Sequence, residues 1–263
     1  MIRRRVLRFF QVSLNLATLA SCRLTRWTGK SKIQIHPKHL WAARAPLWLE
    51  YVKPGDKILD VGAGIGAHAL KCVQEGAFVT AVEKPGGRNW KLLCALTAQQ
   101  PAIRPWACDL EKPFPRTEGE QAFQGALLLD VLEHIANDTQ LLREVARLLM
   151  PGGWLALTLP NRETNWKRRY RKYGMPWMAD RDHKREYTWP EIEAQLAALG
   201  FTVVSGPHVI VYDTPLVGLI DLAGGISLTA YAWLQRRRAK WLQRRPQETS
   251  GWLCIARKDR PQP

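Results

Sequence analysis

The sequence predicts an α/β protein built on a doubly wound, mostly parallel sheet of seven strands. Three observations predict it. From about residue 56, short apolar runs alternate with helical patterns. A glycine-rich turn follows the first apolar run, and an acidic residue follows several of the later apolar runs. This alternation is typical of βαβ units, in which a helix joins neighbouring parallel strands. The chain of 263 residues, 46% of them hydrophobic, is long enough for one large domain with appendages.

The strands and helices expected in the first half of the core end at turn-forming or acidic residues. In order, we expect a strand at 57–61, a helix at 67–74, a strand at 78–82, a helix at 89–98, and strands at 103–108 and 126–129. Glu83, Asp109 and Asp130 each follow a strand directly, so their side chains are expected at the carboxyl edge of the sheet.

The second half begins with a helix over 138–149 that Pro151, Gly152 and Gly153 end. The further elements expected are a strand at 154–159, a helix at 189–199, a strand at 201–204 continuing near 209–212, and a last strand at 252–256. We therefore predict a core over 53–212 and 251–258, with a substrate or lid loop at 162–188 inside it, an N-terminal basic amphipathic region at 1–52, and an insertion at 213–250.

The formal net charge of +16 is concentrated outside the core. Residues 1–44 hold ten Lys and Arg and no acid, residues 162–185 hold nine bases and three acids, and residues 235–245 hold six bases and no acid. The remainder of the chain is mildly acidic. Segregation of this kind predicts that the appendages meet an anionic partner, either membrane headgroups or nucleic acid, with solvated basic faces that bind no partner as the alternative.

Both appendages pair apolar residues with arginines. In residues 1–28, Val6, Phe10, Leu14 and Ala17 recur at helical spacing, which predicts an amphipathic helix. In the insertion, the apolar run 215–234 is interrupted by Asp221, Gly224 and Gly225 and precedes an arginine cluster. We expect a membrane-surface or re-entrant hairpin there, with a spanning helix, a pocket wall and a dimer contact as alternatives.

Cysteine usage and the N-terminus favour the cytoplasm, with peripheral attachment to the inner face of a membrane. The five cysteines are widely separated and form no CxxC pair, so no disulfide framework or zinc site is expected. Residues 19–22 resemble a lipoprotein cleavage box, but Arg8, Gln11 and Asn15 interrupt the apolar segment that export requires.

The strongest motif is the loop Asp60–Gly66, directly after a strand and directly before a helix. Its glycines, Gly62, Gly64 and Gly66, allow a tight turn and a close approach of the backbone to a ligand. The loop also satisfies a dinucleotide-binding pattern, and a carboxylate at Glu83 serves the ribose of either cofactor class. The two classes are separated only by the motifs that follow.

Those motifs resemble the class I S-adenosylmethionine-dependent methyltransferases, specifically the small-molecule O-methyltransferases of the ubiquinone-biosynthesis type. The matching pieces, in family order, are ILDVGAGIGAHAL, VTAVEK, CDLEKPF, LLLDVLEHI, LLMPGGWLALTLPN and HKREYTWPEIEAQLAALGF. The resemblance implies the Rossmann-like methyltransferase fold and S-adenosyl-L-methionine as cofactor. It further implies that Asp60, Gly62, Ala63, Gly64 and Gly66 lie against the methionine moiety. By the same resemblance, Glu83 binds the ribose, Asp109 and Leu110 frame the adenine, and Asp130 lines the pocket.

Methyl transfer is an in-line displacement that depends on alignment and exclusion of water, and a base is needed only where the acceptor loses a proton. His134, after the fourth strand, is the first candidate base and His183 the second, although each could equally serve packing or capping.

The resemblance associates the Glu-His pair with a divalent cation, for which Asp130, Glu133 and His134 offer ligands. Because the motif also occurs without metal, none is predicted.

The function expected is O-methylation of a lipophilic or lipid-linked small molecule at a membrane surface. RNA methylation is the first alternative, since Trp166, Tyr170, Tyr173 and Trp177 alternate with bases. The motifs of amino-methylating and cytosine-C5 DNA enzymes, Asp/Asn-Pro-Pro-aromatic and Pro-Cys, are absent from the sequence. A non-catalytic scaffold is the second alternative, but it would be expected to have lost the glycine loop. Oligomeric state and the methylated atom are not determined by these motifs.

Overall fold

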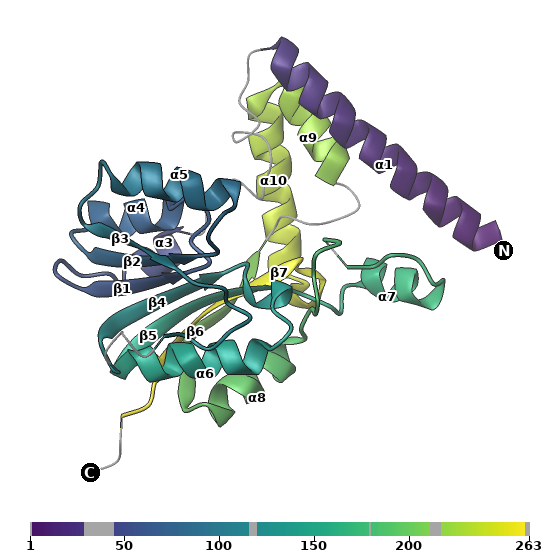
Figure 1. Cartoon of the computed structure of the whole chain (residues 1–263). Coiled ribbons are helices and arrows are strands. Elements are labelled where there is room, and N and C mark those ends of the chain that lie inside the picture. Colours follow the sequence, from purple (N-terminus) through teal and green to yellow (C-terminus); the bar gives the residue numbers. More distant parts are fainter. Residues whose placement is uncertain (1, 29–44, 116–119, 179, 211–216, 261–263) are drawn as a thin grey trace. The chain divides into compact units, whose positions relative to one another are not determined.

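The computed structural model describes residues 2–28, 45–115, 120–178, 180–210 and 217–260 (Figure 1). Contacts divide the chain into two compact units, which are treated separately below. One comprises Met1–Arg44, Asn161–Ala179 and Val209–Gly251, and the other comprises Ala45–Pro160, Asp180–His208 and Trp252–Pro263. The predicted domain boundaries remain predictions, and two of their segments, 29–44 and 211–216, lie outside the described residues.

The larger unit is built on a seven-stranded sheet in the order β3-β2-β1-β4-β5-β7-β6, which confirms the predicted fold class. The strands are β1 (Lys57–Val61), β2 (Phe78–Glu83), β3 (Ile103–Ala107), β4 (Phe123–Leu129), β5 (Leu149–Pro160), β6 (Phe201–Ile210) and β7 (Gly251–Lys258). Strands β1 to β5 pair in parallel, with Asp60 opposite Ala81 on one side and Leu127 on the other. The ends of β1, β2, β3 and β4 therefore meet at one edge.

Strand β7 runs antiparallel to its neighbour β6, because the amide of Asp259 at its end donates to the carbonyl of Gly200 at the start of β6, at 2.8 Å. Helices cover both faces of the sheet (Figure 1). Helices α3 (Ala45–Leu49), α4 (Ala67–Gln74) and α5 (Arg88–Thr97) lie on one face, and α6 (Asp138–Leu148) and α8 (Trp189–Ala198) lie on the other. Leu59, Leu128 and Leu157 pack against α6 in the main core.

Two predicted boundaries were wrong at β5 and β6. Strand β5 begins at Leu149, paired with Phe123, and not at Trp154. The Met150–Gly153 segment, expected to be a turn outside the strand, forms a bulge, since the register shifts between Phe123 and Gly125. Strand β6 is continuous from Phe201 to Ile210, where a break had been expected, and the predicted end of its continuation at Tyr212 lies outside the described residues.

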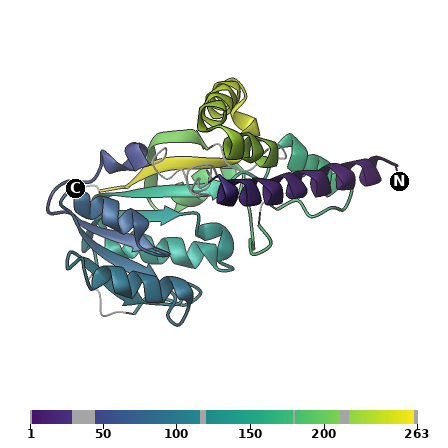
Figure 2. The same ribbon diagram turned by 90° about the horizontal axis from the view of Figure 1, so that it is seen from above.

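The smaller unit is helical. It contains α1 (Ile2–Trp27), α7 (Asn165–Lys172), α9 (Val217–Ile226), α10 (Leu228–Gln243) and the 3₁₀ turn η4 (Pro246–Glu248). Helix α7 lies within the segment predicted as an irregular loop, where its charge density hides the helical period. Helix α1 lies alongside α9, as Figure 2 also shows from above.

The glycine pair of the insertion has a packing role in this unit. Gly224 and Gly225 are both buried, and a Cβ on Gly225 would lie 2.9 Å from Cδ2 of Leu24 on α1. Ser227 then separates α9 from α10 and caps α10, its hydroxyl accepting from the Ala230 amide at 3.3 Å. The apolar run 215–234 is thus divided between two helices, and the side chain of Asp221 lies outside the described residues. Within the described chain, no helix combines the length and apolarity needed to cross a bilayer.

The contact between Gly125 and Trp154 generates a prediction about the sheet. A Cβ on Gly125 would collide with the buried indole of Trp154. We expect Gly125→Ala to lower the free energy of unfolding by about 1–3 kcal/mol, because a packed ring must move. Urea denaturation measures the change. Gly87→Ala is the control, since Gly87 has a φ of −80° and nothing within 4 Å of its Cβ position, and an equal loss there would contradict the explanation.

Candidate functional site

The glycine loop adopts backbone angles that other residues rarely adopt. Gly62, Gly64 and Gly66 have φ of 69°, 59° and 84°. The amide of Ala63 donates to the carbonyl of Val82 at 2.9 Å, which ties the loop to the end of β2. Gly66 is the N-cap residue of α4, so the first turn of that helix opens directly onto the loop. The sequence motif therefore folds as expected, into a strand, a tight turn and a helix N-terminus.

Two of these glycines are required by close approaches. A Cβ on Gly62 would lie 2.5 Å from Cγ2 of Val131, which follows β4. A Cβ on Gly66 would lie 2.7 Å from Cδ2 of Leu96 on α5. By contrast, nothing lies within 4 Å of the Cβ position of Gly64, so its backbone faces open space. This open space allows a ligand to approach the backbone of the loop closely.

Asp60, the first residue of the loop, has a buried side-chain carboxyl. Its residue exposure is 2%, and among the described residues its Oδ2 has no hydrogen-bond partner. Burial, and then the negative charge of Glu83, raise the pKa of Asp60 to about 7 against a lowering hydrogen bond from Ala69. A buried carboxylate of this kind favours a cationic partner.

Glu83 and Asp109 stand at the ends of the next two strands. The Glu83 carboxylate accepts a hydrogen bond from the Gly64 amide at 2.8 Å, so it already faces the glycine loop. Asp109 accepts from the Glu111 amide and pairs with Lys84 at 3.2 Å, and these two contacts, in that order, hold its pKa below the usual range. Leu110 packs against the core beside it. Both carboxylates are available as acceptors at the same edge.

Asp130 is held in a strained conformation at the end of β4. Its φ is 58°, in the left-handed region that non-glycine residues rarely adopt. The buried Thr158 of β5 fixes it twice: the Thr158 hydroxyl accepts from the Asp130 amide at 2.7 Å and donates to its carboxylate at 2.8 Å. This pair of bonds offsets the strain and directs the chain into the 3₁₀ turn η3 (Leu132–His134).

The structure brings the two candidate histidines together. The rings of His134 and His183 lie edge to face with centroids 4.8 Å apart. Nδ1 of His183 lies 2.9 Å from the carboxylate of the buried Glu186. Burial, and then the charge of His183, lower the pKa of His134, which keeps its ring neutral and able to accept a proton at neutral pH.

The segment carrying His183 is fixed to the turn after β4 by backbone bonds. The amides of Lys184 and Arg185 donate to the carbonyl of Glu133 at 2.7 and 3.2 Å. The fully buried Tyr187 donates to Asp138 at 2.7 Å, and burial together with that bond raises the pKa of its phenol. Sequence reasoning did not identify Glu186, Tyr187 or Thr158, although the first two lie in the HKREY run that carried the resemblance.

Three potential metal ligands lie in the same place. The ligand atoms of Glu133, His134 and His183 are within 4.8 Å of one another. The set weighed from sequence had included Asp130, whose carboxylate instead bonds Thr158. Carboxylate and imidazole groups suit zinc and related cations, and the Glu186 contact to His183 resembles the outer support that metal-bound histidines receive.

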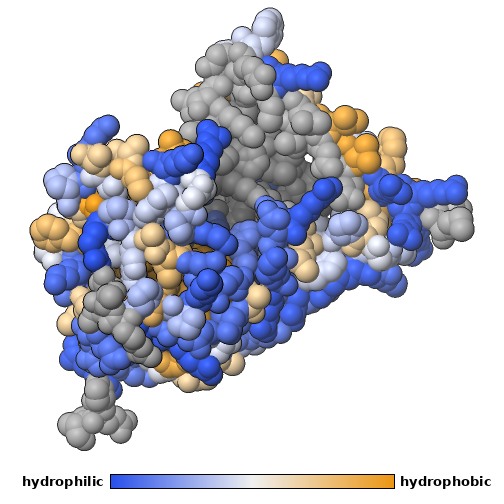
Figure 3. Space-filling model, in the orientation of Figure 1, coloured by the Kyte–Doolittle hydropathy of each residue, from blue (hydrophilic) through white to orange (hydrophobic). Residues whose placement is uncertain are grey.

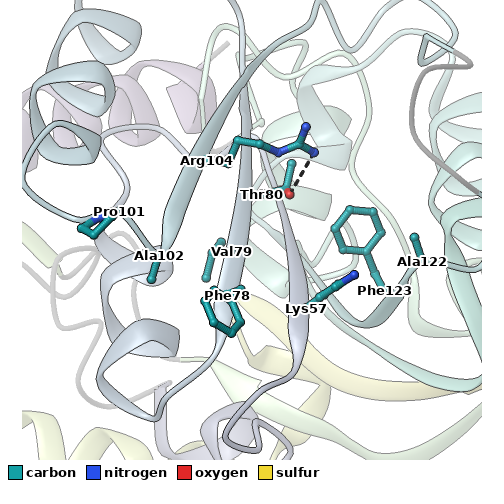
Figure 4. A pocket seen from close by; sticks show the side chains of 9 residues that line it. All are labelled: Lys57, Phe78, Val79, Thr80, Pro101, Ala102, Arg104, Ala122 and Phe123. Atoms are coloured by element: carbon teal, nitrogen blue, oxygen red, sulfur yellow. Dashed lines mark hydrogen bonds between the residues drawn. The ribbon is translucent and has the colours of Figure 1, made fainter.

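A separate cavity lies at the opposite edge of the sheet (Figure 4). It has a volume of about 360 Å³ and is lined by residues near the starts of β1 to β4. Within this lining, Arg104 donates to the Thr80 hydroxyl at 3.3 Å. Its lining residues are Lys57, Phe78, Val79, Thr80, Pro101, Ala102, Arg104, Ala122 and Phe123. Since the predicted site residues all lie at the carboxyl ends of the strands, this cavity is separate from the candidate site.

Comparison with known proteins identifies the family of this chain. A family model described as a methyltransferase domain matches residues 34–206. The chain belongs to this methyltransferase family. With its seven-stranded fold, it is a class I S-adenosylmethionine-dependent methyltransferase.

Curated relatives of the methyltransferase are similar at low identity. The ubiquinone biosynthesis O-methyltransferase of Albidiferax ferrireducens is 30% identical over 118 residues, covering 44% of this chain and 46% of the relative. The protein of the same name from Caulobacter vibrioides is 28% identical over 184 residues, covering 67% and 68%. The chain therefore matches about half the length of the first of these relatives.

Solved structures share the fold at lower identity. The cyclase SpnF superposes with a TM-score of 0.57 at 18% identity, covering 83% of this chain and 80% of that one. A Burkholderia thailandensis 1,6-didemethyltoxoflavin N1-methyltransferase, solved with S-adenosylhomocysteine, gives 0.54 at 21%, covering 93% and 89%. These likenesses establish architecture alone, because one such fold hosts different chemistries.

The residues present fit the cofactor of this family in two respects. S-adenosylmethionine carries a cationic sulfonium and an ammonium group, and the buried Asp60 carboxyl offers one oxygen, Oδ2, that has no hydrogen-bond partner among the described residues. The open space beside Gly64 would receive a ligand that a side chain there would obstruct. Of the residues expected to bind it, the glycine loop and Glu83 are joined by a hydrogen bond. Asp109 follows β3 and Asp130 follows β4, at the same edge of the sheet with β2 and β1 between them.

The glycine contacts predict unequal effects of two similar substitutions. Gly62→Ala must fit a methyl group against Val131 at a positive φ, whereas Gly64→Ala meets only the backbone strain. We expect Gly64→Ala to lower the free energy of unfolding by about 1 kcal/mol and Gly62→Ala by roughly 2–4 kcal/mol. Thermal and urea unfolding measure both, and equal losses would contradict the close approach of Val131.

The pKa of Asp60 predicts a pH dependence of stability. Because its pKa is near 3.8 unfolded and about 7 folded, the folded state binds the extra proton, and stability falls as pH rises between those values. Asp60→Asn removes this loss, so the variant should gain roughly 2–4 kcal/mol over the parent between pH 4 and pH 8. Urea denaturation across that range tests it, and a difference independent of pH would refute the assignment.

Proposed function

We propose that this protein transfers the methyl group of S-adenosylmethionine to an oxygen of a lipophilic or lipid-linked small molecule at a membrane surface. The observation that carries the proposal is the His134–His183 pair beside the end of β4, at the same sheet edge as the glycine loop. A hydroxyl acceptor loses a proton on methylation, and a neutral imidazole there is a suitable proton acceptor. The names of the curated relatives, which are O-methyltransferases of ubiquinone biosynthesis, support oxygen as the acceptor atom.

We assign the cofactor contacts residue by residue. Asp60, Gly62, Ala63, Gly64 and Gly66 would hold the methionine part, with Asp60 directed at its ammonium group. The Glu83 carboxylate would accept hydrogen bonds from the ribose hydroxyls, either in place of the bond from the Gly64 amide or in addition to it. Asp109 and Leu110 would frame the adenine, and Asp130, oriented by Thr158, would line the pocket beside the reacting groups.

The chemistry needs little from the protein beyond alignment and proton removal. The bound cofactor supplies an electrophilic methyl group on a sulfonium. The rigid end of β4, set by Asp130 and Thr158, would orient the acceptor, and the anchored 183–187 segment would exclude water from it. His134 is the first candidate base and His183, oriented by Glu186, the second.

The assignment of Asp60 predicts a loss of cofactor affinity. Asp60→Asn keeps the shape but removes the charge, so we expect S-adenosylmethionine to bind about 10–100-fold more weakly. Titration calorimetry measures it. Asp259→Asn is the control, because Asp259 bonds Thr202 beyond the end of β7, and its affinity should equal that of the parent. Unchanged affinity in Asp60→Asn would remove Asp60 from the cofactor site.

The acceptor assignment predicts which molecules take the methyl group. Labelled cofactor incubated with long-chain phenols, total lipid, polar metabolites and RNA should label the phenol and lipid fractions, with an O-methyl product by mass spectrometry. His134→Asn and His183→Asn should lower kcat with cofactor affinity unchanged, by roughly 10²–10⁴-fold for whichever is the base. Labelling of polar metabolites alone would refute the lipophilic acceptor.

RNA is the second candidate acceptor, favoured by one observation on α10. Arg237 lies 4.8 Å from the ring of Trp233, and Arg245 lies 5.5 Å from that of Trp241, so aromatic and cationic side chains alternate at intervals of four residues. Both tryptophans are nearly half exposed. Exposed rings beside arginines suit base stacking as well as a bilayer interface. Labelling of the RNA fraction with salt-sensitive retention would favour this candidate.

A further inference from the structure

One side of helix α1 carries a continuous exposed stripe. Its members recur at intervals of three and four residues and are Arg5, Phe9, Val12, Leu16, Ala20, Arg23 and Trp27. The exposed fractions of Phe9, Val12 and Leu16 are 69%, 51% and 59%, and that of Trp27 is 85%. In the space-filling view, apolar residues follow α1 with hydrophilic ones towards its ends (Figure 3). Soluble surfaces rarely expose apolar side chains over so many successive turns.

The contacts between α1 and α9 that the structure describes involve residues outside the stripe. Leu7, Ala17 and Leu24 are half-buried, and Leu24 meets Gly225 of α9. Thr28 at the end of α1 donates to the Gly225 carbonyl at 3.4 Å. Of the predicted apolar face, Val6 is 46% exposed and Ala17 is half-buried, while the side chains of Phe10 and Leu14 lie outside the described residues.

Charge along the same helix identifies the partner. Arg3, Arg4, Arg5 and Arg8 are exposed in its first turns and Arg23 in its last, and the helix contains no acid. An apolar centre with arginines at both ends matches an anionic bilayer, in which headgroup phosphates lie above the acyl chains. Two copies of α1 packed stripe to stripe would bring arginines together in either direction, with no acid to pair them. RNA would leave the apolar centre without a partner.

We propose that α1 lies in the interface of an anionic lipid bilayer. Phe9, Val12 and Leu16 enter the acyl region, the arginines bind headgroup phosphates, and α9 holds the opposite side of the helix. The role of this docking, access to a lipophilic acceptor, rests on the proposed function. The observations on α1 do not depend on the catalytic site. The proposed docking also differs from a spanning helix, which the described chain lacks.

Vesicle flotation with the full chain tests the proposal. The parent should float with vesicles of phosphatidylcholine plus phosphatidylglycerol at low salt and much less with phosphatidylcholine alone. The stripe variant Phe9→Gln, Val12→Gln, Leu16→Gln should lose at least about tenfold in partitioning. Replacing Arg3, Arg4 and Arg5 by Gln should cost about fivefold per arginine on anionic vesicles and leave binding to neutral ones unchanged.

The control variant changes the same three residue types elsewhere. Phe78→Gln, Leu92→Gln, Val204→Gln alters side chains that are 59%, 44% and 46% exposed on the other unit, and it should float like the parent. A second variant, Phe9→Leu, Val12→Ile, Leu16→Phe, keeps the stripe apolar and should retain flotation, which separates loss of the stripe from loss of folding.

Three results would overturn the proposal: flotation of the stripe variant like the parent, an equal loss in the control variant, or parent binding that ignores phosphatidylglycerol. Cofactor titration on the same preparations keeps the two proposals apart. If the parent binds vesicles but not S-adenosylmethionine, the proposed function fails while the docking surface stands. If it binds the cofactor but not vesicles, the docking surface fails alone.

Discussion

The backbone of Gly62 passes so close to the side chain of Val131 that no side chain fits between them, and the site depends on this contact. It brings the turn after β1 against the turn after β4, at the edge where the parallel strands end. From that point the chain turns through Asp130, strained at a φ of 58° and fixed by Thr158, into the 3₁₀ turn that carries His134. The close approach of the turns after β1 and β4 therefore places the glycine loop near the turn that carries His134.

The buried carboxyl of Asp60 lowers the stability of the folded state at this edge, and we propose that it is kept there to bind the cofactor. Asp60 is buried without a full set of partners, and its pKa near 7 is the measure of that cost. In a protein selected only for stability, an apolar or amide side chain would serve better at this position. A carboxylate held ready for a cation is what a sulfonium-bearing, ammonium-bearing cofactor requires. Glu83, bonded to the Gly64 amide, adds a second negative charge near the first and raises that pKa further.

The helical unit follows a different principle, because its distinctive feature is the surface that it leaves uncovered. Close packing at Gly225 holds α1 against α9, while Phe9, Val12, Leu16 and Trp27 of the same helix keep half or more of their surface exposed. The family model matches residues 34–206, so α1, α9 and α10 lie outside the segment that it covers. We propose that the edge of the sheet binds the cofactor and that α1 binds the membrane.

The fold class, the strands β1 to β4, helix α4 and the glycine loop could be predicted from the sequence, because strand and helix periodicity and the preference of glycine for positive φ are local properties. The sequence did not determine the bulge over Met150–Gly153, helix α7, or which side of α1 is exposed. Nor did it indicate that His183 and Glu186 lie beside His134, some 50 residues earlier in the chain. Those features depend on contacts between segments far apart in sequence, whose register and packing only the tertiary structure decides.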